Sequence, residues 1–336
     1  MLKCLKKEKE GVSVGIKLGS FEMKRGVCLA PMAGYTDRAM RLVCHKYGAE
    51  YSVTEMVSAK AVVYGDKKTF SLARILPDEG PTSIQIFGSE PEIMAEAAVM
   101  LLNSPEGAGS VAIDVNMGCP VNKIFGNGEG SALMKSPELI ERITRAICGA
   151  IKIPTTVKIR AGINKDSINA VECALAAEEG GASLLCIHGR TREQMYGGEA
   201  DREIIKNVKS ALQIPVIANG DILDGESALA MLRDTGADGI AIGRGAVGNP
   251  FIFSEIIAAT KGKNYTPPTI EERVDTALLQ LRLAVEEKGE RIAIPEARKQ
   301  IALYLRSFHG AARIRAEINR ALSYREVEVA LKSALE

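Results

Sequence analysis

The sequence predicts a (β/α)8 TIM barrel with a small, all-helical domain at its C-terminal end. Eight short apolar runs, most of them rich in valine and isoleucine, recur between residues 27 and 242, and helical patterns separate most of them. This alternation indicates βαβ units that build a parallel sheet. An open doubly wound sheet would carry a GxGxxG turn after its first strand, whereas the first run here leads into Ala-Pro-Met-Ala-Gly. Eight units without that turn favour the closed barrel.

The expected elements follow the chain in a regular order. A hairpin precedes the barrel, with strands at 14–18 and 21–25 that turn at Gly19-Ser20. The connection between the second and third barrel strands is expected to combine irregular structure with a helix. The expected barrel strands are 27–30, 51–55, 83–87, 111–115, 155–159, 184–187, 215–218 and 239–242, and the helices between them are 37–47, 92–102, 137–150, 167–179, 202–211 and 227–234.

After the barrel, a polar segment at 261–268 that ends in two prolines predicts a linker. Beyond this segment, helical patterns span 271–287, 295–308, 311–322 and 326–335. We therefore expect a barrel domain over residues 12–260 and a separate helical domain over residues 268–336.

Composition excludes several classes of protein. The 336 residues are 46% hydrophobic and 25% charged, as in an ordinary globular protein, and the net charge of +1 means that any basic surface must be local. No apolar run reaches the roughly 18 residues of a membrane span, and the lysine-rich N-terminus lacks the apolar segment of a signal peptide. The seven cysteines form no CxxC pair, which argues against zinc, iron–sulfur and dithiol redox sites. We expect a cytoplasmic protein with reduced thiols, no membrane segment and no metal.

Polar residues at the strand ends define one candidate site, because barrel enzymes place their chemistry at the C-terminal ends of the strands. Gln85, Lys158 and His188 stand in or directly after apolar strands, where a polar side chain is costly to bury without a partner. The fourth strand leads into Asn116-Met-Gly-Cys-Pro, which places Cys119 on a loop between a glycine and a proline. The alternatives are a structural loop cysteine for Cys119 and a buried ion pair for Lys158.

Glycine-containing loops after the last two strands indicate a phosphate site. Asn219-Gly220-Asp221 follows the seventh strand and Gly243-Arg244-Gly245 follows the eighth, and such loops turn backbone N–H groups towards an anion. The alternative is that these glycines only make tight turns. Together with a buried lysine on the fifth strand, the loops favour a cofactor with a phosphate tail and an electron-rich head, such as FMN.

Six motifs, in order along the chain, resemble those of the tRNA-dihydrouridine synthases, and the helical tail and overall length most resemble the bacterial B-type branch. The resemblance covers nearly the whole chain and implies an enzyme that reduces uridine in the D-loop of tRNA to 5,6-dihydrouridine. It also implies bound FMN that is re-reduced by NADPH, with NADH as the other candidate. The motifs are APMAGYTD at 30–37, NMGCP at 116–120, VKIR at 157–160, IHGRTR at 187–192, ANGD at 218–221 and GR at 243–244.

The resemblance also implies a role for each site residue. Hydride passes from reduced flavin to C6 of the uracil, and Cys119 donates a proton to C5, which requires a neutral thiol. Lys158 would stabilise negative charge on reduced FMN, and Gln85 would hydrogen-bond the pyrimidine edge of the flavin. Asn116 would help to place the uracil, and Arg160 is a candidate for a flavin or RNA contact. Further flavin contacts are expected from Pro31, Met32 and Ala33 along the ring system, and from His188, Asn219, Gly220, Asp221, Gly243 and Arg244 around the ribityl and phosphate groups.

Basic residues in the tail suggest how RNA would bind. Lys299, Arg306, Arg313 and Arg320 recur every seven residues, a spacing that keeps side chains near one helix face. If the helices continue in register, these four residues form a basic stripe for RNA phosphates. The alternative is a solvated or salt-bridged face, and His309-Gly310 could break the helix. In the family this region often has histidine where this chain has Gln300.

Two other functions stay open at this point. An FMN barrel that reduces a free pyrimidine, like the dihydroorotate dehydrogenases, would share the flavin site but would not need a basic tail. A non-catalytic tRNA-binding protein would keep the tail on a barrel without flavin. We expect the synthase, with FMN and the chemistry in residues 12–260, tRNA bound by residues 268–336, and a monomeric chain.

Overall fold

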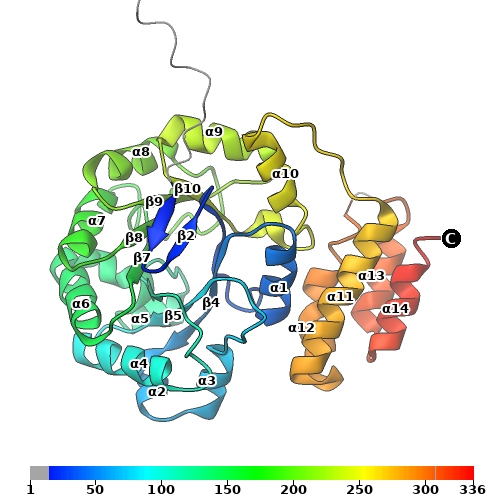
Figure 1. Cartoon of the computed structure of the whole chain (residues 1–336), viewed down its shortest axis with the longest axis horizontal. Helices are drawn as coiled ribbons and strands as arrows, with labels where there is room; N and C mark the ends of the chain where they lie inside the picture. The colour runs from blue at the N-terminus through cyan, green and yellow to red at the C-terminus, as the bar shows by residue number, and fades with distance from the viewer. Residues whose placement is uncertain (1–14, 307) are drawn as a thin grey trace, which may run out of the picture.

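The structure, a computed structural model, describes residues 15–306 and 308–336. Eight parallel strands, β3 to β10, close into a barrel in which β10 pairs with β3. Helices ring the barrel, and a further helical group lies to one side (Figure 1). This arrangement confirms the predicted fold class. The barrel strands are β3 (Val27–Leu29), β4 (Tyr51–Ser58), β5 (Thr82–Phe87), β6 (Ile113–Asn116), β7 (Thr155–Arg160), β8 (Leu184–His188), β9 (Val216–Asn219) and β10 (Gly239–Ile242).

The hairpin formed by β1 (Ile16–Leu18) and β2 (Phe21–Met23) closes one end of the barrel. Ile16, Leu18 and Met23 are buried among lumen residues of the barrel strands. The turn at Gly19 lies against Pro154, just before β7 begins, so the hairpin covers the N-terminal ends of the strands (Figure 1). The hairpin was predicted, although residue 14 of the first predicted strand lies outside the described part of the chain.

Helices cover the outside of the barrel in the expected places, and further helical segments appear after β4, after β6 and at the end of the barrel. The expected irregular connection after β4 contains two short helices, and the loop after β6, expected to be irregular, contains a short helix and a 3-10 turn. The last barrel helix, α10, was not predicted because its sequence is apolar around most of its circumference. The helices are α1 (Arg38–Lys46), α2 (Ala59–Val63), α3 (Lys67–Leu72), α4 (Pro91–Asn103), α5 (Asn122–Gly126), η1 (Gly130–Lys135), α6 (Pro137–Ala150), α7 (Ala170–Glu179), α8 (Arg202–Ala211), α9 (Gly225–Thr235), η2 (Arg244–Ala246) and α10 (Ile252–Thr260).

Alternation along β6 decides which side chains reach the site. Ile113 and Val115 pack into the core between the strands and the helices, and successive strand side chains point to opposite faces. Asp114 and Asn116 therefore face the lumen. The same alternation directs Lys158 of β7 and His188 of β8 inward, towards the carboxyl ends of the strands.

The tail consists of α11 (Ile270–Lys288), α12 (Glu290–Ile301), α13 (Ala311–Arg320) and α14 (Tyr324–Lys332). The prediction of a helix over 295–308 was wrong at both ends. The helix begins at Glu290 and accommodates Pro295 in its second turn. After Ile301 the chain changes to i→i+3 hydrogen bonds, including Tyr304 N to Ile301 O and Arg306 N to Leu303 O, and this turn buries Tyr304 and its neighbour Leu305 completely.

The tail shares its core with the barrel. Phe251, at the start of α10, is buried within the apolar cluster of the tail helices. The Tyr47 hydroxyl at the end of α1 lies 2.7 Å from the Thr276 hydroxyl on α11, and Lys288 Nζ donates to Asp37 Oδ2 at 2.8 Å.

No helix in the described part of the chain is long and apolar enough to cross a membrane.

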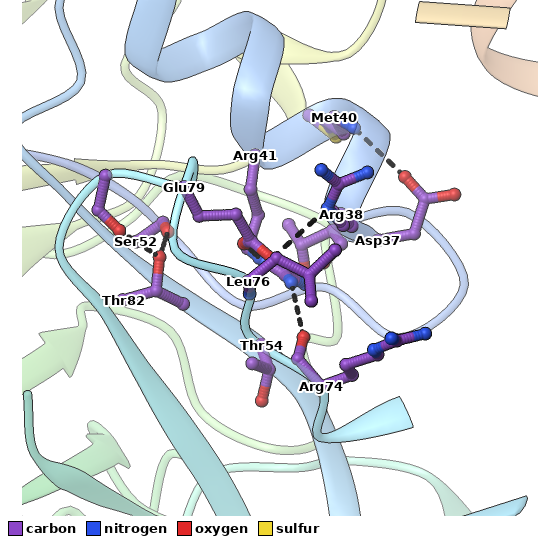
Figure 2. A network of polar contacts seen from close by, with 12 residues as sticks. Asp37, Arg38, Met40, Arg41, Ser52, Thr54, Arg74, Leu76, Glu79 and Thr82 are labelled. Atoms are coloured by element: carbon purple, nitrogen blue, oxygen red, sulfur yellow. Dashed lines mark hydrogen bonds and ion pairs between the residues drawn. The ribbon is translucent and has the colours of Figure 1, made fainter. Parts of the chain in front are cut away.

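A buried ion pair connects α1 to the segment that precedes β5 (Figure 2). Arg41 Nε donates to Glu79 Oε2 at 2.8 Å, and both side chains are at most 2% exposed. The remaining guanidinium nitrogens donate to the main-chain carbonyls of Thr36 and Arg74, at 2.9 and 3.0 Å. The pair therefore fixes α1, and with it the β3–α1 loop, against the barrel wall.

Candidate active site

A cavity of about 540 Å³ opens at the carboxyl ends of the barrel strands, a size typical of small-molecule sites. Every residue that was expected to contact a cofactor lines it, and so do Cys119, Asn116, Arg160 and Arg306. The structure therefore brings residues from all eight strand ends to one place. The expected cofactor residues in the lining are Pro31, Met32, Ala33, Gln85, Lys158, His188, Asn219, Gly220, Asp221, Gly243 and Arg244.

The loop that carries Cys119 is fixed at both sides of the cysteine. Asn116 Oδ1 accepts hydrogen bonds from the main-chain N–H groups of Cys119 at 2.8 Å and Gly118 at 3.2 Å. The Cys119 carbonyl accepts from the hydroxyl and the N–H of Ser131, at 2.7 and 3.1 Å. Asn116 thus acts on the backbone of the loop, in addition to lining the cavity.

Cys119 is 9% exposed and lines the cavity. Burial raises the pKa of the thiol above its ordinary value, against smaller opposing effects of a backbone hydrogen bond from Val121 and of the charges on Arg160 and Lys158. The raised pKa favours the neutral thiol at physiological pH, which is the form that the family resemblance requires of a proton donor.

Arg160 holds the cysteine loop against the loop after β8. Its Nε donates to Gly118 O at 2.9 Å, and its Nη1 donates to the carbonyls of Thr191 at 2.9 Å and Met195 at 3.0 Å. The side chain is 3% exposed. Arg160 was considered as an RNA contact, but these three bonds direct its guanidinium to main-chain carbonyls of the protein.

Positive charge gathers on one side of the cavity. Lys158, Arg160 and Arg244 line it together with a single carboxylate, that of Asp221. Burial lowers the pKa of Lys158 below its ordinary value. Burial and the four neighbouring cations Lys158, Arg160, Arg190 and Arg244 lower the pKa of His188 to about 2, so the imidazole is neutral and would offer a phosphate a neutral hydrogen bond rather than a charge.

The loop after β9 is held by an arginine that the sequence did not assign. Arg190 is 2% exposed, and its Nη2 lies 2.8 Å from Asp221 Oδ2. Arg244 Nη2 lies 3.4 Å from the other oxygen of the same carboxylate. Asp221 also accepts from Ala200 N at 2.8 Å and has a positive φ of 51°, a conformation that its neighbours must enforce. Asp221 is thus a bridge between two arginines at the rim of the cavity.

The expected basic stripe of the tail is not continuous. Residues 302–306 form turns that do not continue α12, and Gly310, with φ of 85°, is the N-cap of α13. Lys299 and Arg306 turn towards the barrel: Lys299 Nζ lies 4.4 Å from the ring centre of Tyr35, and Arg306 lines the cavity. Arg313 instead pairs with Glu317 at 3.4 Å on an exposed face. Arg320, also exposed, lies at the far end of α13, and neither it, Arg313 nor Lys299 is part of the cavity lining.

Comparison with known proteins places the chain in a family. The family described as dihydrouridine synthase (Dus) matches residues 28–336. The chain belongs to the dihydrouridine synthase family. It is 39% identical over 306 residues to a probable tRNA-dihydrouridine synthase of Rickettsia conorii, covering 90% of this chain and 91% of that protein. It is also 39% identical over 308 residues to tRNA-dihydrouridine synthase B of Xanthomonas axonopodis pv. citri, covering 91% of each.

Among solved structures, a variant of NCR from Zymomonas mobilis aligns with this member of the dihydrouridine synthase family at a TM-score of 0.53 and 16% identity. The alignment covers 79% of this chain and 95% of that one. At this level of identity the likeness shows the shared fold alone.

Several residues that line the cavity of this dihydrouridine synthase family member were not predicted. Tyr35, Met56 and Leu303 contribute to the wall, and Tyr196 lies over Arg244, with 4.8 Å between the guanidinium carbon and the ring centre. Leu303 carried no signal, because its position depends on the turn after α12. Asp114, which lies outside the cavity lining but accepts a hydrogen bond from Gln85, could also have been found, because it is an acidic residue inside an apolar run. In the described part of the chain, no group of three or more His, Cys, Asp or Glu side chains is arranged to hold a metal ion.

Proposed function

We propose that this chain reduces uridine in the D-loop of tRNA to 5,6-dihydrouridine, with FMN held in the cavity at the barrel mouth and re-reduced by NADPH. The observation that carries the proposal is that the neutral thiol of Cys119 shares one cavity with Lys158 and with the glycine loops that follow β9 and β10. The names of the two relatives described above, which are tRNA-dihydrouridine synthases, support the same reaction.

The donor set of the cavity fits FMN. Four cationic side chains, those of Lys158, Arg160, Arg244 and Arg306, line it against one carboxylate, which suits a ligand that carries a phosphate. The apolar segment from Ala30 to Ala33 forms one wall for a planar ring system. Bound FMN would supply the hydride. Lys158 would place a positive charge beside the ring, and the Gln85 amide would contact its polar edge.

Cys119 supplies the proton. Its thiol carries a hydrogen at neutral pH because burial raises its pKa, and a general acid must hold its proton at the working pH. The hydrogen bonds from Gly118 and Cys119 to Asn116 fix the loop, so the thiol is held in place while C5 of the uracil receives the proton. The sulfur recovers its proton from solvent after each turnover.

The tail would bind the RNA near the mouth of the cavity. Arg306 lines the cavity itself and Lys299 lies beside it over Tyr35, so both can meet phosphates next to the reacting nucleotide. A uridine in folded tRNA must leave its stack to enter such a cavity, at a cost of a few kcal/mol. The helical segment 268–336 would therefore recognise the shape and backbone of the tRNA.

The test is to incubate the purified protein with FMN, NADPH and unmodified tRNA transcripts and to map dihydrouridine by mass spectrometry. We expect one or a few D-loop uridines to gain two hydrogens. Free uracil and orotate serve as substrates for the rival barrel reductase, and NADH as the alternative reductant. Turnover of free pyrimidine without turnover of tRNA would contradict the proposal.

The Cys119→Ala variant tests the proposed proton donor separately from the binding and reduction of the cofactor. The variant should bind FMN and oxidise NADPH in air as the wild type does, but it should form little dihydrouridine. Normal formation of dihydrouridine by this variant would exclude Cys119 as the proton donor.

A further inference from the structure

A carboxylate that does not line the cavity lies directly beneath one of the lining residues, Gln85. Asp114, on β6, is 3% exposed and is absent from the cavity lining. Gln85 Nε2 donates to its Oδ2 at 2.6 Å, and the Thr156 hydroxyl donates to its Oδ1. Burying a charge at this depth is costly unless it is paired and hydrogen-bonded; besides these two donors, the charge of Lys158 acts on Asp114.

Asp114 starts a row of hydrogen bonds that ends at the catalytic loop. Gln85 uses its amide nitrogen towards Asp114 and accepts with Oε1 from Asn116 Nδ2 at 2.9 Å. Asn116 then accepts with Oδ1 from the N–H groups of Gly118 and Cys119. Each amide in the row therefore has one end pointing down the barrel and the other pointing towards the cavity.

The chemistry of both ends sets the direction of the row, because Asp114 only accepts hydrogen bonds and the N–H groups of Gly118 and Cys119 only donate them. An ionised carboxylate only accepts hydrogen bonds, whereas an amide side chain both donates and accepts and can be turned by 180° with little change in shape. Asp114 forces the nitrogen of Gln85 to face it, so the oxygen of Gln85 faces Asn116. The nitrogen of Asn116 must face Gln85, and its oxygen is left for the backbone of the cysteine loop.

We propose that Asp114 is a positioning residue, which through Gln85 and Asn116 fixes both the amide offered to the cofactor and the loop that presents Cys119. The effect on Cys119 stands on the structure alone. The effect on the cofactor rests on the function proposed above. Asp114 acts without touching substrate, and the row is the route by which it does so.

Asp114→Asn tests the direction with almost no change in volume. An asparagine can present either oxygen or nitrogen to Gln85, so only the N–H groups of the loop still favour the original direction and some molecules adopt the reversed orientation. In the full-length protein, we expect amide hydrogen exchange of the segment 117–121 to become about threefold to tenfold faster, as expected for one weakened hydrogen bond. Exchange is measured by mass spectrometry after pepsin digestion, with and without FMN.

The double variant Asp114→Asn with Gln85→Glu provides the decisive comparison. The new amide at position 114 would then donate to the carboxylate of residue 85, and the second oxygen of that carboxylate would accept from Asn116 Nδ2. The orientation of Asn116 is restored, so exchange of the segment 117–121 should return to within about twofold of wild type. FMN affinity should stay reduced, because residue 85 no longer has an N–H group in its side chain.

Thr156→Val is the matched control, because it removes the other hydrogen bond to Asp114 without altering the direction of the row. It should leave exchange of the segment 117–121 unchanged. Wild-type exchange in Asp114→Asn, or failure of the double variant to restore it, would overturn the proposal; a merely structural role would give equal effects in Asp114→Asn and Thr156→Val. If Asp114→Asn does not fold, the double variant still tests the proposal. Only a restored hydrogen-bond direction predicts wild-type exchange of the segment 117–121 in that variant. The exchange arm needs neither flavin nor turnover, so it can succeed or fail independently of the proposed activity.

Discussion

The side-chain amide of Gln300 donates to the main-chain carbonyl of Tyr35 across 3.1 Å, and so joins a helix of the tail to a loop that lines the active-site cavity. Gln300 is 3% exposed, and its oxygen accepts from Gln280 Nε2 at 2.8 Å. Gln280 in turn accepts from the Tyr304 hydroxyl at 2.6 Å. The tail is therefore part of the support of the cavity, in addition to its proposed role in RNA binding.

Gln300→Leu should loosen this support. The variant leaves Gln280 Nε2 and the Tyr35 carbonyl without their partner, and we expect the free energy of unfolding in urea to fall by about 1–3 kcal/mol. FMN affinity should fall as well, because the β3–α1 loop is less firmly held. Gln300→His, which retains a ring N–H that can donate to Tyr35, should recover part of both losses. An unchanged flavin affinity in Gln300→Leu would show that the tail does not act on the loop.

His188 should make the protein sensitive to acid. Its pKa is lowered from 6.5 to about 2 by burial and by neighbouring cations, so the unfolded chain takes up a proton that the folded chain refuses. The stabilisation is complete above pH 6.5 and declines as the pH falls below that value, by up to about 1.4 kcal/mol per pH unit. Urea denaturation of wild type and His188→Asn between about pH 5 and 8 isolates this contribution as the difference between the two proteins. The two curves should converge towards low pH, and parallel curves would contradict the assignment.

Replacing only one residue of the Arg41–Glu79 pair should lower the free energy of unfolding considerably. Arg41→Met leaves Glu79, at 0% exposure, with only the longer ion pair to Arg38 Nε at 3.7 Å, and breaking a buried pair from one side costs about 3–5 kcal/mol. Arg41→Met with Glu79→Leu removes both charges and should be closer to wild type than either single variant. Thermal unfolding gives the measurement. Additive losses in the double variant would mean that the two residues stabilise the fold separately.

Arg306 and Arg313 should differ in their effect on tRNA binding, although both belong to the same seven-residue pattern. Arg306 lines the cavity, whereas Arg313 pairs with Glu317 on an exposed face. Arg306→Ala should weaken tRNA binding and reduce the slope of log affinity against log salt by about one. Arg313→Ala should change both quantities much less. Equal effects of the two variants would restore the idea of one continuous basic face.

The barrel was predictable because burial on two faces imposes a strong pattern. On β7, Val157 and Ile159 pack on the helix side, whereas Thr156, Lys158 and Arg160 alternate with them on the lumen side. Polar residues inside an apolar run therefore mark positions that face the lumen. Gln85, Lys158 and His188 are such residues, and all three line the cavity. The parallel register then brings their strand ends together regardless of their distance in the sequence.

The turn after α12 could not be predicted from local pattern. Residues 295–308 have the periodicity of a helix, but Tyr304 reaches Gln280 on α11 and Leu305 enters the shared core. These tertiary contacts outweigh the propensity of a short segment. The position of Arg306 followed from that turn, whereas Lys299 lies on α12 before it, so the predicted stripe is interrupted between these two residues. The hydrogen bonds of Asp114 and Arg160 could not be predicted either, because their partners lie on other strands and loops.

The hairpin that covers the N-terminal ends of the strands has a kinetic consequence. Because Ile16, Leu18 and Met23 fill that end of the lumen, the carboxyl-terminal mouth is the approach to the cavity for the pyridine nucleotide and for the RNA alike. On the proposed function the two cannot occupy it together, so the nucleotide must depart before the tRNA docks. Reciprocal plots at several fixed tRNA concentrations should then be parallel lines, the mark of a ping-pong order, with each substrate inhibiting competitively against the other at high concentration.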